Sequence, residues 1–430
     1  MPMKTDMVTL EQLLLDCLKE GEPVEAARFA ALTPDEWRAL VALAVTQRVS
    51  PLLWHRLKQK ARGGDLPQEV AQTLQDALRQ NTMRNLARYG ELRALLTTLN
   101  REGIPLFLLK GIYLADAVYD VTGLREMNDI DVLARTADLA RVAKALAERG
   151  YTSLQPICPE VTLKTCHHLP RMIKAGSAAF EIHWNIAGPE ESCSVNPEWL
   201  WQHAVPVQVA GCAALALSPE ALLLHLCLHT SYHHQFAFGL RPSCDIAALI
   251  TRFGPALDWR TVSDQAVRSG WQRGVYLALR LAHELVEARV PLEVLERLRP
   301  LDMTDDVLAT TRAQIFGDKQ IAASISSPFA RLLESRNLFD KIRIFGQRVF
   351  ISRAAIAGRY SVPVHSRWIY AYYPYRILDL LHRHCHQAKE YHTSNIALRG
   401  TVGRADAIAS WLAAPMPQQK GSSADSVFSA

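Results

Sequence analysis

The chain has 430 residues, 49% of them hydrophobic and 21% charged, and a formal net charge of +5. This composition is ordinary for a soluble globular protein of two or three domains. The eight cysteines form no CxxC pair and have no regular spacing, which argues against a zinc ribbon or a disulfide framework and suits a reducing compartment. The N-terminus lacks the apolar segment of a signal peptide, and no run approaches the roughly 18 apolar residues of a spanning helix. We therefore expect a cytoplasmic protein without a transmembrane segment.

Residues 1–100 have a helical pattern almost throughout. Thr33, followed by Pro34 and two acidic residues, is a typical helix start. The long stretch Val70–Asn100 carries leucines with polar residues between them, which indicates an amphipathic helix. These features predict an N-terminal helical domain over residues 1–100.

The next stretch has the pattern of a strand, a glycine turn and a helix. Ile104–Leu109 is a short apolar run typical of a buried strand, Lys110-Gly111 ends it, and Ile112–Tyr119 has helical character. A helix N-terminus after such a turn presents free backbone N–H groups to an anion, and Lys110 adds a positive charge at the same place. The pattern indicates a phosphate-binding turn.

Asp129 and Asp131 lie two residues apart, around the start of a second apolar run, Ile130–Leu133. The branched residues of this run favour a strand, in which alternate side chains share a face. Both carboxylates then point the same way, and a hard cation such as Mg²⁺, which prefers oxygen ligands, relieves their repulsion. An isolated Asp-x-Asp is more often a solvated strand end, so the surrounding residues decide between the two interpretations.

A third carboxylate follows on a predicted hairpin. The runs His168–Ile173 and Phe180–Trp184 flank a turn at Gly176. In the second run Glu181 and His183 share one face of the strand. Three carboxylates on neighbouring strands are able to hold two metal ions about 3.5–4 Å apart.

The pattern LLKG…R…NDIDVL…GY…EIHW resembles an uncharacterised bacterial nucleotidyltransferase family of the DNA polymerase β-like superfamily. It is also similar to nucleotidyltransferase toxins with a Lys-Gly-Gly turn and an Arg-x-Ser-x-Asp-x-Asp strand. The resemblance extends from about Trp37 to the 250s and is strongest over Leu108–Leu133. One position departs from it: Gly111 is followed by Ile112, where the polymerase β-like enzymes have a serine and the toxins a second glycine.

This resemblance implies an α+β fold with a small mixed-sheet nucleotidyltransferase core at residues 101–190, flanked by N-terminal and C-terminal helical domains. It implies transfer of a nucleoside monophosphate (NMP) from a nucleoside triphosphate (NTP) to an acceptor hydroxyl, with release of pyrophosphate and two Mg²⁺ ions as cofactors. The implied catalytic residues and metal ligands are Asp129, Asp131 and Glu181. The implied nucleotide-binding residues are Lys110, Gly111, Arg125 and His183. The acceptor stays open between a small molecule, a glycan, a protein and RNA.

Ser218 and Pro219 begin a further predicted helix that extends to about His233. His225, His229 and His233 are four residues apart and share a face of such a helix. Three histidines along one straight helix rarely surround one ion, and no carboxylate completes the set, so zinc binding is the weaker interpretation. We expect His229 to pack or hydrogen-bond between two lobes, with one or two of the histidines near the nucleotide.

Arg241 and Asp245 are four residues apart on the next predicted helix. The expected arrangement is an ion pair between them. The alternative is that Arg241 contacts a phosphate. Residues 191–300 as a whole are predicted to form a helical domain that closes the cleft over the core.

Residues 301–413 are predicted to be helical and basic, and the segment 331–400 has twelve Arg or Lys against four Asp or Glu. This excess suits RNA or another anionic partner, and it suits a solvated helical face equally well. The aromatic stretch Trp368–Tyr375 is suited to base stacking or to packing. Residues 414–430 are small and polar, and we expect a disordered tail there.

Three functions stay open on the sequence. The first is the Mg²⁺-dependent nucleotidyltransferase described above. The second is a catalytically inactive nucleotidyltransferase-like binding or assembly module, which Ile112 in the phosphate turn favours because a fold can persist without its chemistry. The third is a toxin that modifies tRNA, for which the basic segment 331–400 is weak support.

Overall fold

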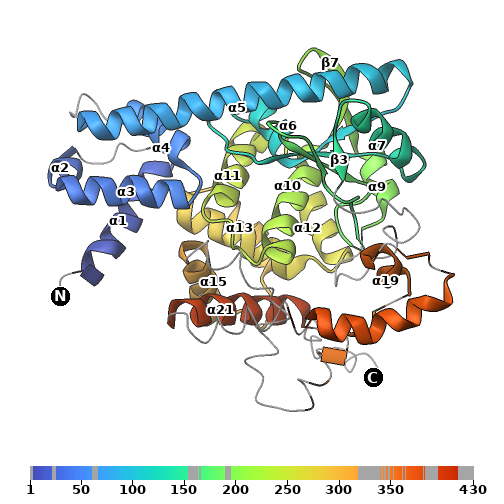
Figure 1. Cartoon of the computed structure of the whole chain (residues 1–430). Coiled ribbons are helices and arrows are strands. Elements are labelled where there is room, and N and C mark those ends of the chain that lie inside the picture. The colour runs from blue at the N-terminus through green and yellow to red at the C-terminus, as the bar shows by residue number, and fades with distance from the viewer. Residues whose placement is uncertain are drawn as a thin grey trace, which may run out of the picture.

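The structure is a computed structural model of the chain. It describes residues 3–21, 26–60, 66–153, 163, 166–188, 195–317 and 396–414, with scattered positions between 339 and 382. The fold is α+β, as the sequence predicts, with a mixed sheet that helices precede and follow along the chain. Figure 1 shows one long helix along the top of the molecule, the sheet below it, and further helices beneath the sheet.

The N-terminal region is helical. Its helices are α1 (Met3–Leu18), α2 (Ala26–Ala30), α3 (Pro34–Thr46), α4 (Ser50–Lys60) and α5 (Gln68–Arg101). At the start of α3 the Thr33 hydroxyl accepts from the Glu36 N–H at 3.3 Å, and the Glu36 carboxylate accepts from the Thr33 N–H at 2.7 Å. This reciprocal cap satisfies two backbone donors that the helix cannot satisfy itself, so the predicted helix start is confirmed.

Helix α5 connects the N-terminal region to the sheet. Its leucines at 74, 92, 95, 96 and 99 are fully buried, and one face of the helix packs against α4 and the other end against strand β7. The buried amides of Asn81 and Asn85 donate to the backbone carbonyl of Arg125, both at 3.0 Å. The helix therefore fixes the loop that carries Arg125 as well as covering the core.

The sheet has seven strands in the order β3-β4-β5-β2-β1-β7-β6. Their bounds are β1 (Phe107–Leu108), β2 (Asp129–Leu133), β3 (Thr152–Ser153), β4 (Met172–Ile173), β5 (Ala179–His183), β6 (Ala204–Val209) and β7 (Cys212–Leu217). Strand β2 pairs antiparallel with β1 and parallel with β5, and β4 pairs antiparallel with β5 as the predicted hairpin. The helices of this part are α6 (Lys110–Ala117), η1 (Thr136–Asp138) and α7 (Leu139–Ala147).

The sheet continues past residue 190, in a region for which we expected helices alone. Strands β6 and β7 form a hairpin, and β7 pairs parallel with β1 through Phe107 and Leu215. The turn consists of Ala210 and Gly211, both with positive φ (51° and 73°), which matches a two-residue hairpin turn. The alanine-rich sequence of β7 (CAALAL) lacks the branched residues that mark a strand, so only its tertiary neighbours reveal it.

Helices of the central and C-terminal regions lie below the sheet in Figure 1. The central ones are α9 (Pro197–Gln202), α10 (Pro219–Leu228), the π-helical turn η2 (His229–His233), α11 (Arg241–Phe253), η3 (Gly254–Ala256), α12 (Trp259–Arg268), α13 (Gln272–Val286) and α14 (Leu292–Leu298). The C-terminal ones are α15 (Asp305–Phe316), α19 (Arg353–Tyr360), η4 (Arg367–Ala371) and α21 (Ile396–Ala413). Helix α21 packs against α15 and also touches η2.

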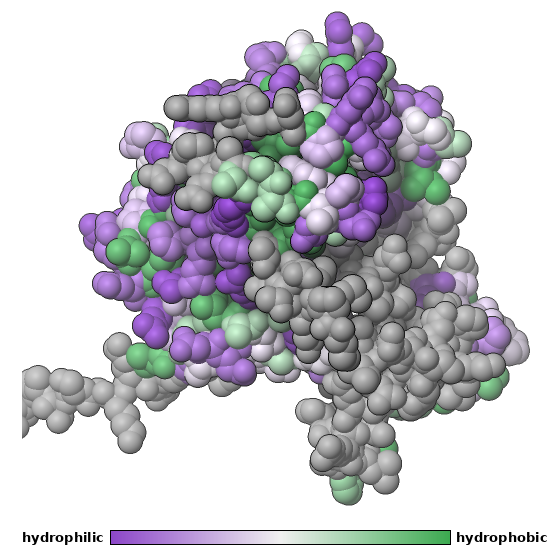
Figure 2. All heavy atoms as spheres, turned by 90° about the vertical axis from the view of Figure 1, so that its left-hand side faces the viewer, coloured by the Kyte–Doolittle hydropathy of each residue, from purple (hydrophilic) through white to green (hydrophobic). Residues whose placement is uncertain are grey.

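Part of the basic segment 331–400, including residues 331–338 and 383–395, and the expected tail after residue 414 lie outside the described residues. Within the aromatic stretch, Ile369 is buried, whereas Trp368, Tyr370 and Tyr375 are exposed. No described helix is both long and apolar enough to cross a membrane. Figure 2 shows that the face at the left of Figure 1 is largely hydrophilic, with small groups of hydrophobic residues between the polar ones.

Candidate active site

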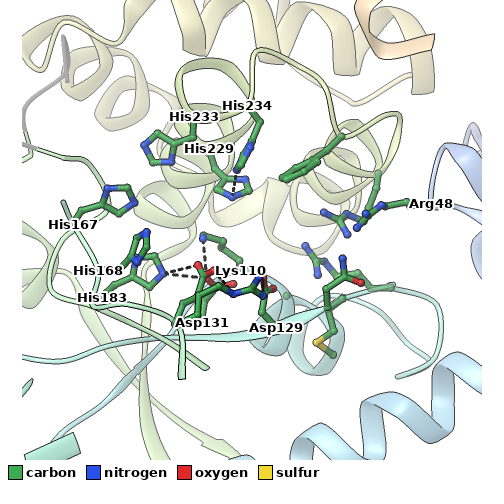
Figure 3. A pocket seen from close by; sticks show the side chains of 18 of the residues that line it. Arg48, Lys110, Asp129, Asp131, His167, His168, His183, His229, His233 and His234 are labelled. Carbon is green, nitrogen blue, oxygen red and sulfur yellow. Dashed lines mark hydrogen bonds and ion pairs between the residues drawn. The ribbon is translucent and has the colours of Figure 1, made fainter. Parts of the chain in front are cut away.

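A cavity of about 620 Å³ lies between the sheet on one side and the turn η2 and the start of α11 on the other. Its size falls within the roughly 300–1,000 Å³ of typical small-molecule sites. Figure 3 shows three groups of side chains around it. We call them the carboxylate floor (Asp129, Asp131, Glu181), the histidine wall (His167, His168, His183, His229, His233, His234) and the arginine end (Arg48, Arg125, Arg241).

The carboxylate floor is built by the register of two parallel strands. Asp131 on β2 lies directly beside Glu181 on β5, and Asp129 is two residues earlier on the same face of β2. The alternate residues of β2, Ile130 and Val132, are fully buried on the opposite face. The hydrophobic positions therefore fix the face toward which the three carboxylates point.

Lys110 lies at the start of α6 and reaches the floor. Its Nζ is 2.9 Å from the Asp131 Oδ1, and both side chains are buried. The backbone of Lys110 has φ +45°, a left-handed conformation that is uncommon for a residue with a β-carbon and is found most often at functional sites. A β-carbon at the next residue, Gly111, would collide with the Arg125 guanidinium. Lys110 and Gly111 thus both line the cavity, as the sequence suggests.

Ile112 does not enter the cavity. Its side chain is fully buried, and its carbonyl accepts a hydrogen bond from the Tyr89 hydroxyl at 3.0 Å. The departure from the glycine or serine of related enzymes therefore strengthens the core and leaves the cavity side of the turn open.

His183 belongs to the floor as much as to the wall. Its Nε2 lies 3.0 Å from the Asp131 Oδ1 and 3.7 Å from the Glu181 Oε2. Among the described residues, Asp131, Glu181 and His183 are the group whose donor atoms all lie within 4.8 Å of one another. Asp129, which we expected in the metal set, lies beside this group rather than in it.

Arg171 lies between the carboxylates of Asp129 and Glu181. Its guanidinium is 3.3 Å from the Asp129 Oδ2 and 3.0 Å from the Glu181 Oε1. The Arg171 side chain is half exposed, so it is held less tightly than Lys110. No feature of the sequence had pointed to it, because its position follows from the hairpin of β4 and β5.

The environments of the two aspartates push their pKa values apart. Burial alone raises the pKa of Asp131, but Lys110 and the hydrogen bond from His183 outweigh it and hold the pKa far below its usual range. Burial and repulsion from Asp131 and Glu181 raise the pKa of Asp129. For Glu181, burial is outweighed by the hydrogen bond with His183, so its pKa is lowered. Asp131 and Glu181 are therefore the more acidic carboxyl groups of the floor, and Asp129 is the least acidic one.

The histidine wall depends on the π-helical turn. Helix α10 ends at Leu228, and the wider turn η2 moves the following residues out of the α-helical phase. As a result His229, His233 and His234 line the cavity, while His225 is buried below it. The predicted shared face is nevertheless kept, because the ring of His229 lies 6.3 Å from that of His225 and 5.9 Å from that of His233, measured between centroids.

Histidines from a second segment complete the wall. The ring of His167 stacks on His233 at a centroid distance of 5.0 Å and on His183 at 5.5 Å. The Nε2 atoms of His229 and His234 are 3.1 Å apart, so one ring donates a hydrogen bond to the other. The prediction that His229 lies between two lobes agrees with its place opposite the sheet (Figure 3).

At the arginine end, Arg125 is neutralised by a buried carboxylate. Its Nε and Nη2 donate to the two oxygens of Asp245, both at 2.9 Å, and the Tyr119 hydroxyl donates to the same carboxylate at 2.9 Å. The expected ion pair between Arg241 and Asp245 is therefore wrong. The competing partner, Arg125, is more than a hundred residues away in the sequence, so helical spacing could not reveal it.

Arg241 instead lies beside Arg48, which nothing in the sequence had marked. The Arg241 Nη1 donates to the carbonyl of Glu126 at 3.1 Å. The ring of Phe238 lies 5.5 Å from the Arg241 Cζ and 5.8 Å from the Arg48 Cζ. Two guanidinium groups thus share one aromatic ring at the edge of the cavity.

Comparisons with known proteins identify a family for this chain. The model of an uncharacterised nucleotidyltransferase family matches residues 33–287, more than half of the chain. No curated protein matches the sequence. The solution structure of the antibiotic-resistance factor ANT(2'')-Ia is similar with a TM-score of 0.31 and 15% identity, over 46% of this chain and 98% of that one. On the family match, this chain belongs to the uncharacterised nucleotidyltransferase family.

Proposed function

We propose that this protein is a Mg²⁺-dependent nucleotidyltransferase that moves NMP from an NTP to an acceptor hydroxyl and releases pyrophosphate. The observation that carries the proposal is the carboxylate floor, in which Asp131 and Glu181 lie side by side on parallel strands with Asp129 on the same face. The floor opens into a cavity large enough for a nucleotide. Membership in a nucleotidyltransferase family supports the reaction class.

The donor set of the floor fits a hard divalent cation. It offers carboxylate oxygens from Asp129, Asp131 and Glu181, which Mg²⁺ prefers over nitrogen. His183 Nε2 is engaged with Asp131 at 3.0 Å, so the imidazole acts here as a partner of the carboxylate and holds it in place. Mg²⁺ held by these carboxylates would activate the attacking oxygen and stabilise the departing pyrophosphate.

The other residues have roles that follow from their positions. Lys110 and the Gly111 turn place positive charge and backbone N–H groups beside the transferring phosphate. Glu181 lies beside Asp131 on the floor, and its carboxylate accepts the proton of the acceptor hydroxyl, directly or through water. Arg171 lies over Glu181 and Asp129 and must leave or turn when the cation binds there.

The histidine wall faces the floor across the cavity and is the side from which the acceptor approaches. Imidazole rings offer both hydrogen-bond donors and acceptors as well as flat faces for stacking. Burial, and then the charge of Lys110, lower the pKa of His229 well below its usual range, so this ring is neutral. A neutral ring at this position suits a hydroxyl-bearing acceptor, whether a small molecule, a glycan, a protein or RNA.

A catalytically inactive binding module is the second candidate. The observation in its favour is that Lys110, Arg171 and His183 already compensate the charges of the floor. Ile112 does not favour this candidate, since its side chain is buried outside the cavity. For a tRNA-modifying toxin, the basic segment 331–400 stays the sole support, and it lies partly outside the described residues.

The proposal is tested by incubating the protein with each of the four NTPs, labelled on the α-phosphate, together with Mg²⁺ and a cell lysate. We expect one class of acceptor to become labelled and pyrophosphate to appear. The Asp131→Asn variant should be inactive, and Asp120→Asn, an exposed aspartate outside this cavity, should be as active as the original protein. NTP binding without any labelled product in all four reactions would favour the inactive module.

A further inference from the structure

Positive charge is left without a carboxylate at the arginine end. Arg125 is paired with Asp245, whereas no described carboxylate lies within ion-pair distance of Arg48 or Arg241. On the floor, by contrast, Lys110 and Arg171 both have carboxylate partners. The cavity is therefore divided into a region rich in carboxylates and a region with two uncompensated guanidinium groups.

These two arginines are held in place by the surrounding fold. The buried side chain of Gln47, next to Arg48, accepts a hydrogen bond from the Leu240 N–H, next to Arg241, at 3.1 Å. Gly239 packs so closely on this turn that a β-carbon there would be 2.7 Å from the Gln47 Oε1. Arg48 itself has φ +59°, a conformation that directs the chain through a tight turn between α3 and α4.

Such an arrangement is unfavourable without a ligand. The Arg241 Nε is buried and has no hydrogen-bond partner among the described residues. Burial, and then repulsion from Arg125, lower the pKa of Arg241 to about 10, which still leaves it charged at neutral pH. Like charges that share a site, with donors left unsatisfied, indicate that an anion completes it.

We propose that Arg48 and Arg241 bind the β- and γ-phosphates of the NTP. This inference rests on the proposed function, because the α-phosphate would then lie over the carboxylate floor and the rest of the triphosphate would extend toward Arg48, which lies at the other end of the cavity from the histidines (Figure 3). Guanidinium groups bind phosphate oxygens through paired, charge-assisted hydrogen bonds. The triphosphate would then link the N-terminal helical region, which supplies Arg48, to helix α11, which supplies Arg241.

The test is calorimetric titration of the protein with inorganic tripolyphosphate in the presence of Mg²⁺, which needs neither turnover nor an acceptor. The variants Arg48→Gln and Arg241→Gln should each weaken binding by about ten- to a hundredfold. The double variant should lose less than the product of the two, because both side chains hold the same anion. Arg252→Gln is the matched control, since Arg252 lies on the same helix but lines a different cavity and donates to the Ala117 carbonyl.

The same variants separate a triphosphate site from a site for a phosphorylated acceptor. Binding of NTP should weaken as much as binding of tripolyphosphate, while binding of NMP should stay unchanged. Equal affinities for tripolyphosphate in all variants, an equal loss in Arg252→Gln, or no binding by the original protein would each overturn the assignment. Loss of binding in the two variants supports it even if no acceptor is ever labelled, in which case the proposed transfer alone fails.

Discussion

The carboxylate floor and the arginine end differ in how they are assembled and in how their charges are balanced. The floor comes from two neighbouring strands, and Lys110, Arg171 and His183 compensate its acidic groups within the protein. The arginine end comes from three segments far apart in the sequence, and only one of its three guanidinium groups has a carboxylate partner. The charges of the floor are thus largely balanced by neighbouring side chains, whereas two guanidinium groups of the arginine end have no such partner among the described residues.

The largest expected effect separates the two regions by their kinetics. Asp131→Asn removes the central carboxylate of the floor, so we expect kcat to fall at least about a hundredfold, a loss of the size seen when one transition-state contact is removed. Arg48→Gln should mainly raise KM for the NTP, because its contact exists before the reaction as well as during it. Steady-state transfer rates at varied NTP concentration give both constants.

The comparison breaks down if the two variants show the same pattern. A kcat loss in Arg48→Gln as large as that in Asp131→Asn would mean that the arginine end acts on the reacting atoms. Unchanged kcat in Asp131→Asn would remove the floor from catalysis altogether. Circular dichroism of each variant confirms that the fold is intact before the constants are compared.

The second expected effect concerns the contribution of the Arg125–Asp245 ion pair, at the arginine end, to the free energy of unfolding. Asp245→Asn leaves the buried Arg125 without its counter-charge, so we expect the free energy of unfolding to fall by about 3–5 kcal/mol. Tyr119→Phe removes one hydrogen bond to the same carboxylate and should cost only about 1 kcal/mol. Urea denaturation measures both losses.

A double variant tests whether the Arg125–Asp245 pair contributes to NTP binding in addition to the stability of the fold. Replacing Arg125 and Asp245 together by Met and Leu should recover most of the stability, since apolar side chains of similar volume suit a buried site. Recovery of stability with a raised KM for the NTP would show that Arg125 also contributes to the positive field at this end. A double variant as unstable as Asp245→Asn would contradict the expected balance of charge and burial.

The sequence predicted the floor far better than the arginine end, for a physical reason. Strand alternation places Asp129 and Asp131 on one face and Glu181 on one face of its own strand, and the parallel pairing of β2 with β5 then brings the three together. Arg48 and Arg241 lie close together because their neighbours Gln47 and Leu240 are joined by a hydrogen bond. These two residues are 193 positions apart in the sequence, so no local pattern contains the contact.

The histidine wall shows a second limit of reading the sequence. The spacing of residues 225, 229 and 233 predicts one helical face, which their ring contacts confirm, but it predicts neither the π-helical turn after Leu228 nor the contribution of His167. The strand β7 was missed because its alanines carry little preference for a strand. In each case packing against distant residues, rather than local preference, selects the conformation.

A third, smaller effect concerns Arg171, which lies between two carboxylates of the proposed cation site. Arg171→Gln removes a positive charge shared by Asp129 and Glu181, so we expect the affinity of the protein for Mn²⁺, a spectroscopic substitute for Mg²⁺, to rise by up to about fivefold. Electron paramagnetic resonance titration measures free Mn²⁺. Lys174→Gln, which removes a pair with Glu91 away from the cavity, is the control. Weaker Mn²⁺ binding in Arg171→Gln would show that Arg171 supports the metal site instead of competing for it.

The smallest expected effect is on the pH dependence of the free energy of unfolding. It depends on the buried ring of His225, which lies behind the cavity. Burial, and then the charge of Lys110, hold the pKa of His225 well below its usual value of about 6.5, so the folded protein keeps this ring neutral. As the pH falls below about 6.5, His225 is protonated in the unfolded chain and stays neutral in the folded one. The free energy of unfolding therefore falls by up to about 1.4 kcal/mol for each pH unit. His225→Leu should reduce this slope between pH 6.5 and 5 without abolishing it, because the pKa values of His229 and His234 are lowered as well. Urea denaturation at several pH values measures the slope, and an unchanged slope would mean that His225 binds its proton in the folded protein.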